Sequence, residues 1–96
     1  MTTMSEGILH HLLLYEYVEG MAERRGPHRE AHLEHIAAEQ AAGRVVMAGA
    51  LGDPPTGGAF AFRGATVAEI EAFVGDDPYR RAGLITSYRI ELWTLV

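Results

Sequence analysis

The sequence predicts one α+β domain in which strands and helices follow in the order strand, helix, strand, strand, helix, strand. Three observations lead to this prediction. Apolar runs of strand length are bounded by glycine- and proline-rich turns, two segments carry apolar residues at helical spacing, and 96 residues suit one domain. We take residues 1–96 as that domain, with residues 1–6 as a flexible N-terminus.

The predicted strands cover residues 8–18, 44–51, 59–63 and 84–96. The first strand is apolar on both faces, because Leu12 and Leu14 point to one side of it while Leu13 and Tyr15 point to the other. Two helices in so short a chain cover only one side of a sheet. We therefore expect the other side to be covered by a second subunit, in a homodimer.

The first predicted helix starts at Pro27 and ends near Ala42, with Gly43 as the residue that terminates it. At helical spacing its core face is the apolar stripe Leu33, Ile36, Ala37 and Ala41, and the polar stripe beside it is His28, His32, His35 and Glu39. The second helix starts at Thr66, which forms a capping box with Glu69. Its apolar face is Val67, Ile70, Phe73 and Val74. Both helices on one face of an antiparallel four-stranded sheet make the split βαβ, or ferredoxin-like, arrangement.

Composition excludes several classes of function. Without cysteine there is no disulfide, no thiolate nucleophile and no cysteine-based metal site. The net charge of −5 argues against nucleic acid and anionic membranes as partners. No apolar run approaches the roughly 20 residues of a membrane span, and the polar N-terminus does not fit a secretory signal. We expect a cytoplasmic protein.

Several short motifs follow one another over nearly the whole chain. They are Arg29-x-x-His32-Leu33, Gly43, Gly49, the loop Asp53 to Gly58, Thr66-Val67-Ala68-Glu69-Ile70, Phe73, Asp77-Pro78-Tyr79, Gly83 and Trp93. Together they resemble the YCII (YciI-like) family. The resemblance implies a dimeric ferredoxin-like fold related to the dimeric α/β barrels, with a cleft that contains a His–Asp pair at His32 and Asp77. It also implies lyase-type chemistry, which in the family has been associated with chlorinated or hydroxylated aromatics.

His32 and Asp77 are therefore the candidate catalytic pair. A neutral imidazole accepts and returns a proton near neutral pH, and a carboxylate beside it orients the ring. The residues alone also permit a plainer interpretation, in which His32 flanks the core and Asp77 bonds backbone amides in the turn at Pro78.

Three further residues are candidate substrate contacts. Arg24, Arg25 and Arg29 stand at the start of the first helix and could hold a carboxylate or phenolate, or form a solvated basic surface. Arg29 has the best claim, since it precedes His32 by about one turn. Tyr79, two residues after Asp77, and His28, one turn before His32, complete the set.

Metal binding is the remaining possibility on the first helix. His28 and His32 have the spacing of helical zinc ligands, and His10 or His11 could supply another ligand. A solvated polar face explains the same pattern with fewer assumptions, because the glutamate of the zinc motif is not where it should be. We predict neither a metal nor a cofactor.

The sequence thus predicts a cofactor-independent enzyme that uses His32 and Asp77 for lyase- or isomerase-type acid/base chemistry on a small aromatic or enol-type molecule. The alternative is a non-catalytic module that binds a small molecule or serves dimeric assembly. A purely structural dimer, which would bind no ligand, is the third class.

Overall fold

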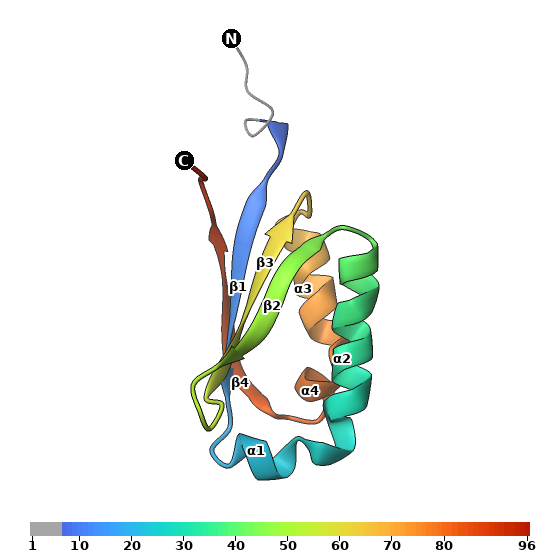
Figure 1. Ribbon diagram of the computed structural model, residues 1–96, viewed down its shortest axis with the longest axis vertical. Coiled ribbons are helices and arrows are strands. Elements are labelled where there is room, and N and C mark those ends of the chain that lie inside the picture. Colours follow the sequence, from blue (N-terminus) through green and yellow to red (C-terminus); the bar gives the residue numbers. More distant parts are fainter. Residues whose placement is uncertain (1–6) are drawn as a thin grey trace.

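The computed structural model describes residues 7–96, which form an antiparallel sheet with helices packed on one face (Figure 1). Residues 1–6, for which the sequence predicts a flexible N-terminus, lie outside the described residues. The elements follow in the order β1 (His10–Tyr17), α1 (Met21–Arg24), α2 (Gly26–Ala41), β2 (Val45–Leu51), β3 (Gly57–Arg63), α3 (Val67–Asp76), α4 (Pro78–Arg81) and β4 (Ile85–Leu92).

The sheet has the strand order β2-β3-β1-β4, and every neighbouring pair is antiparallel. Helices α2, α3 and α4 lie against one face, and α1 lies at the end of the sheet where α2 begins (Figure 1). The opposite face carries no helix of the described residues. This is the α+β ferredoxin-like arrangement, so the predicted fold class is confirmed.

Local signals at the helix ends are also confirmed. At the start of α3, Thr66 Oγ1 accepts the backbone N–H of Glu69 at 3.1 Å, and Glu69 Oε1 accepts that of Thr66 at 2.8 Å. Gly43 follows α2 with φ +81, and its N–H bonds the carbonyl of Gln40 while the next N–H bonds that of Glu39. Such left-handed termination favours glycine, which has no Cβ to clash.

The short helices α1 and α4 were not predicted, because four residues are too few for helical periodicity to show. α4 depends on its two ends instead. Asp77 caps its start by accepting the backbone N–H of Tyr79, and proline occupies its first position. Gly83, with φ +74, ends it, and the N–H groups of Gly83 and Leu84 bond the carbonyls of Arg80 and Tyr79.

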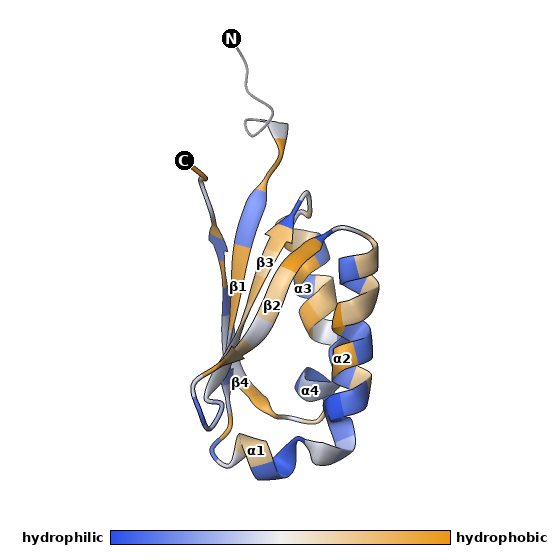
Figure 2. Ribbon diagram, in the orientation of Figure 1, coloured by the Kyte–Doolittle hydropathy of each residue, from blue (hydrophilic) through white to orange (hydrophobic). Residues whose placement is uncertain are grey.

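The predicted core face of α2 was right for Ile36 and wrong for its other three residues. Of this helix only His32 and Ile36 are buried, whereas Leu33 is 45% exposed and both predicted alanines lie on the surface. The polar stripe turns inward because its histidines find aromatic partners: His32 stacks on Tyr79 and His35 on Phe73. Figure 2 accordingly shows hydrophobic residues gathered on the strands, while α2 is mostly hydrophilic.

The core lies between the sheet and the helices. Its largest members are Leu13, Tyr15, Phe60, Phe62, Ile70, Phe73 and Val74. Val67, predicted for the apolar face of α3, is 47% exposed in the first turn of that helix. On β1 the residues facing the helices are buried, while Leu12 and Leu14 on the opposite face are half-buried. Among residues 7–96, no helix is both long and apolar enough to cross a membrane.

Candidate functional site

Asp77 is the centre of the candidate site and is fully buried. Its Oδ1 accepts the backbone N–H of Tyr79 at 2.9 Å and the Nδ1–H of His32 at 2.8 Å. Its Oδ2 accepts the hydroxyl of Tyr15 at 2.8 Å. Donors from α4, α2 and β1 therefore converge on one carboxylate, which is the environment that a buried ionised carboxylate requires.

His32, in the second turn of α2, is held by two contacts. Its ring stacks on that of Tyr79, with 3.6 Å between the centroids and 9° between the planes, and its Nδ1 bonds Asp77. An ionised carboxylate can only accept hydrogen bonds, so Nδ1 carries the proton and Nε2 keeps a lone pair in the neutral ring. Nε2 makes no hydrogen bond within residues 7–96. It is therefore the nitrogen that remains available to a ligand.

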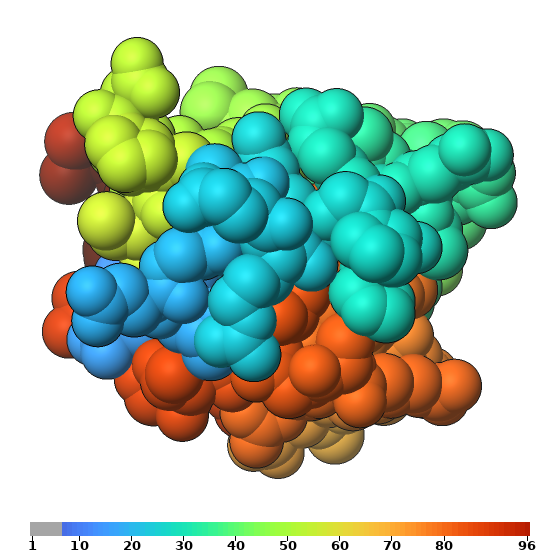
Figure 3. All heavy atoms as spheres, turned by 90° about the horizontal axis from the view of Figure 1, so that it is seen from below, coloured from blue at the N-terminus to red at the C-terminus, as the bar shows by residue number. Residues whose placement is uncertain are grey.

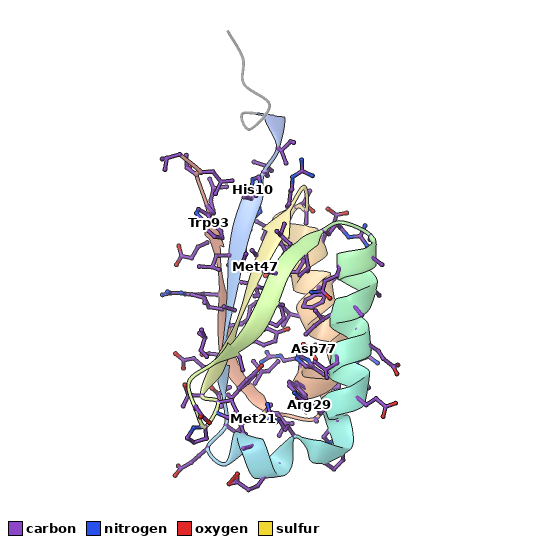
Figure 4. All side chains as sticks on the ribbon, viewed as in Figure 1. His10, Met21, Arg29, Met47, Asp77 and Trp93 are labelled. Carbon is purple, nitrogen blue, oxygen red and sulfur yellow. The ribbon has the colours of Figure 1, made fainter. Side chains whose placement is uncertain are left out.

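A cavity of about 390 Å³ adjoins His32, between α2 and the edge strand β2. Its polar wall consists of Tyr17, Arg25, Arg29, His32, Gln40 and Tyr79. Its apolar wall consists of Leu33, Ile36, Phe60 and the segment Ala48, Gly49 and Ala50. Arg29 and Asp77 both lie between the N-terminal half of α2 and the sheet (Figure 4). The volume is in the range of small-molecule sites.

Burial keeps the tyrosines around Asp77 in their neutral, hydrogen-bonding form. It raises the pKa of Tyr15 far above the usual range, and the charge of Asp77 and the hydrogen bond to it raise that pKa further. Burial also raises the pKa of Tyr17, with Arg25 opposing the shift. The pKa of Tyr79 is raised by burial too, against the positive charges of Arg25 and Arg29. All three hydroxyls can donate at neutral pH.

The structure brings together most of the residues predicted for the site. His32 and Asp77 are in direct contact, and Arg29 and Tyr79 line the cavity beside them. His28 is half-buried one turn earlier on α2 and is not part of the cavity wall. Its predicted substrate contact therefore has no support in this geometry, because the helix turns that position away from the cavity.

The metal hypothesis can be examined at the same residues. His32 already uses Nδ1 for Asp77. Within residues 7–96, no group of three or more histidine, aspartate or glutamate side chains is arranged to hold an ion. His10 and His11 lie on β1, where the Nδ1 of the buried His11 has no hydrogen-bond partner.

Sequence reasoning missed Tyr15 as a partner of Asp77. The signal was present: Tyr15 shares a strand face with the buried Leu13, and a buried tyrosine hydroxyl usually bonds another group. Sequence reasoning also could not tell which of the three arginines would line the cavity. Arg25 and Arg29 line the cavity, whereas Arg24 lies outside its wall. Figure 3 views this end of the molecule, where α1 and the start of α2 lie beside α4.

Several solved structures share this fold. The 5-chloro-2-hydroxyhydroquinone dehydrochlorinase TftG from Burkholderia phenoliruptrix AC1100, in complex with 2,5-dihydroxybenzoquinone, superposes with a TM-score of 0.74 at 23% identity, over 88% of this chain and 92% of that chain. Protein SO0527 from Shewanella oneidensis gives a TM-score of 0.56 at 14% identity, over 90% of this chain and 88% of that chain. At these identities the likeness shows the fold alone.

A third structure is that of a Bacteroides thetaiotaomicron VPI-5482 protein assigned provisionally to the antibiotic biosynthesis monooxygenases, with a TM-score of 0.60 at 12% identity, over 96% of this chain and 92% of that chain. No curated protein matches the sequence. The family model of the YCII-related domain, in contrast, matches residues 9–94, from just before β1 to just past β4. Since that match covers nearly the whole chain, the protein belongs to the YCII-related domain family.

Proposed function

We propose that this protein is a cofactor-independent cytoplasmic enzyme that uses His32 as general acid/base on a small aromatic or enol-type molecule, in a lyase- or isomerase-type reaction. The observation that carries the proposal is the 2.8 Å hydrogen bond from His32 Nδ1–H to the buried Asp77, beside a cavity that His32 lines. A nitrogen base oriented by a carboxylate is the usual arrangement for moving a proton to and from a substrate.

In an elimination, Nε2 of His32 takes a proton from an acidic O–H or C–H of the substrate. The electron pair left behind forms a new double bond, and the leaving group departs with the pair of the bond that breaks. Asp77 stabilises the imidazolium through Nδ1–H, and Arg29 holds the negative oxygen that develops on the substrate. The imidazolium then returns its proton to water. Such a proton transfer contributes about 10²–10⁴-fold to the rate.

The first assay is the release of chloride from 5-chloro-2-hydroxyhydroquinone, the compound in the name of the structural neighbour TftG. We expect turnover by the native protein and its loss in His32→Gln. Asp77→Asn removes the negative charge beside the imidazole and should lower kcat by about 10²–10⁴-fold with little change in KM. His28→Gln is the matched control, since this histidine is on the same helix but outside the cavity wall.

Two results would contradict the proposal. One is turnover in His32→Gln equal to that of the native protein. The other is an equal loss in His28→Gln and His32→Gln, because activity would then depend on the integrity of α2 and not on His32 as a base. Nitrogen chemical shifts of His32 provide a check without substrate: the native ring should carry its proton on Nδ1, as the bond to Asp77 requires.

A non-catalytic binding module is the second candidate, and one observation favours it. His32 is only 5% exposed and Tyr79 2%, so little of either ring can be reached without some movement of the cavity wall. In this case 2,5-dihydroxybenzoquinone should raise the Tm without being turned over, and Asp77→Asn should at most weaken that effect. A purely structural dimer would show no stabilisation by any small molecule.

We also propose a homodimer that forms through the open face of the sheet. That face carries Leu12, Met47, Leu51 and Trp93 around a hollow of about 290 Å³, and Met47 is 65% exposed. Sedimentation equilibrium should find a dimer for the native protein and a monomer for Met47→Glu. Val67→Glu places the same charge at an exposed position on the helix side and should remain dimeric. A native monomer would refute this association.

A further inference from the structure

The cavity beside His32 has a positively charged end. Arg25 and Arg29 lie four positions apart at the start of α2, and both line the cavity. The ion pairs formed between arginines and carboxylates within residues 7–96 involve Arg44, Arg81 and Arg89 instead. The cavity wall contains no aspartate or glutamate. In a protein of net charge −5, this concentration of positive charge selects an anion.

The other end of the cavity is apolar and extends further along the helix. Leu33 and Ile36 follow the arginines on α2, and Gln40 is the last residue of this helix in the cavity wall. Between Arg29 and Gln40 the helix rises by about 16 Å. The facing wall is the segment Ala48–Ala50 of β2, whose small side chains leave the space open. The cavity is therefore longer than a single aromatic ring.

His32 lies between these two ends in the sequence of α2, and it lines the same cavity. His32 therefore lies beside the part of a ligand where an acidic head joins an apolar body. The neutral hydroxyls of Tyr17 and Tyr79, which also line the cavity, can donate to the acidic group.

We propose that the cavity binds an organic acid whose negative group lies between Arg25 and Arg29 and whose apolar body, a fused two-ring system in size, lies along Leu33 and Ile36. Arg25 then makes the cavity selective for a negatively charged ligand, and Leu33 makes it selective for a ligand with a longer apolar body. This inference rests on the proposed use of the same cavity, but it concerns binding and is tested by binding alone.

The probes are 3-hydroxy-2-naphthoate, its neutral amide, and salicylate, which has the same acidic head on one ring. Isothermal titration of the native protein should give the tightest binding for the naphthoate. Loss of the charge in the amide should weaken binding roughly 10- to 100-fold. Loss of the second ring in salicylate should weaken it roughly tenfold, because less apolar area is buried.

Two variants separate the two ends of the cavity. Arg25→Met should weaken the naphthoate roughly 10- to 100-fold and leave the amide nearly unchanged. Arg24→Met is its matched control, since this neighbouring arginine lies outside the wall, and it should change neither. Leu33→Gln should weaken the naphthoate roughly three- to tenfold but not salicylate. Leu33 is 45% exposed, so this variant should fold normally.

The inference is overturned if the native protein binds none of the probes, if the amide binds as well as the naphthoate, or if Arg24→Met and Arg25→Met act alike. Failure of the proposed function looks different. Suppose that the naphthoate binds with the expected dependence on Arg25 and Leu33, while His32→Gln shows no loss of any turnover. The binding of an organic acid in the cavity would then be supported, and the enzymatic role would be contradicted.

Discussion

Tyr15→Phe removes one hydroxyl from the core and leaves the ring in place. That hydroxyl donates to Asp77 Oδ2 at 2.8 Å, and the two residues are 2% and 0% exposed. Water therefore has no ready access to replace the lost donor. One oxygen of a buried carboxylate is left without a partner, and a hydrogen bond to a charged group contributes about 1.5–3 kcal/mol.

In a domain of this size, 1 kcal/mol corresponds to about 4–8 °C in Tm. We therefore expect Tyr15→Phe to lower the Tm by about 6–24 °C. Tyr88→Phe is the matched control. Tyr88 is half-buried on β4, its hydroxyl makes no hydrogen bond within residues 7–96, and its ring stays beneath the guanidinium of Arg80. The control should change stability by less than about 0.5 kcal/mol.

The assay is thermal unfolding followed by circular dichroism, with urea unfolding as an independent measure of the free energy. A Tm for Tyr15→Phe within error of that for Tyr88→Phe would contradict this prediction. It would mean that Asp77 does not depend on the Tyr15 hydroxyl. In Tyr15→Phe the nitrogen shifts of His32 should still report a proton on Nδ1, because the acceptor of that bond, Asp77 Oδ1, is untouched.

Four further predictions concern stability. The pKa values of Tyr15 and Tyr17 are raised in the fold, so their contribution to stability should be constant below pH 10, the ordinary tyrosine value, and be lost above it; phenolate absorbance that appears before unfolding would contradict this. Thr66→Ala should cost about 1 kcal/mol by removing the cap of α3, as urea unfolding will measure. The pKa of Glu69 is lowered by its bonds to Thr66, so its contribution should be present above pH 4.5 and be lost as the pH falls further; an acid limb unchanged in Glu69→Gln would exclude this. Gly83→Ala should cost about 1–2 kcal/mol, because φ is +74 while nothing crowds the new methyl group, and a variant as stable as the native protein in urea would contradict this.

The elements that were predicted correctly depend on neighbours in the chain. The capping box of Thr66 and Glu69 spans three residues, and Gly43 ends α2 through carbonyls of the preceding turn. Strand order followed from the sequence of elements, since the compact arrangements of such a chain are few. The core face of α2 was wrong at Leu33, Ala37 and Ala41, because periodicity assigns burial by hydrophobicity. It cannot show that His32 and His35 find stacking partners on α4 and α3.

The fold class, the helix caps and, through its motifs, the family follow from the sequence alone. It also named His32, Asp77, Arg29 and Tyr79 as candidates. It takes the packed fold to show that Asp77, 45 residues after His32 and 62 after Tyr15, accepts a hydrogen bond from each. The difference lies in the separation along the chain. Caps and turns are formed by atoms a few residues apart, whereas a buried carboxylate takes its partners from whichever elements the packing of the core brings to it.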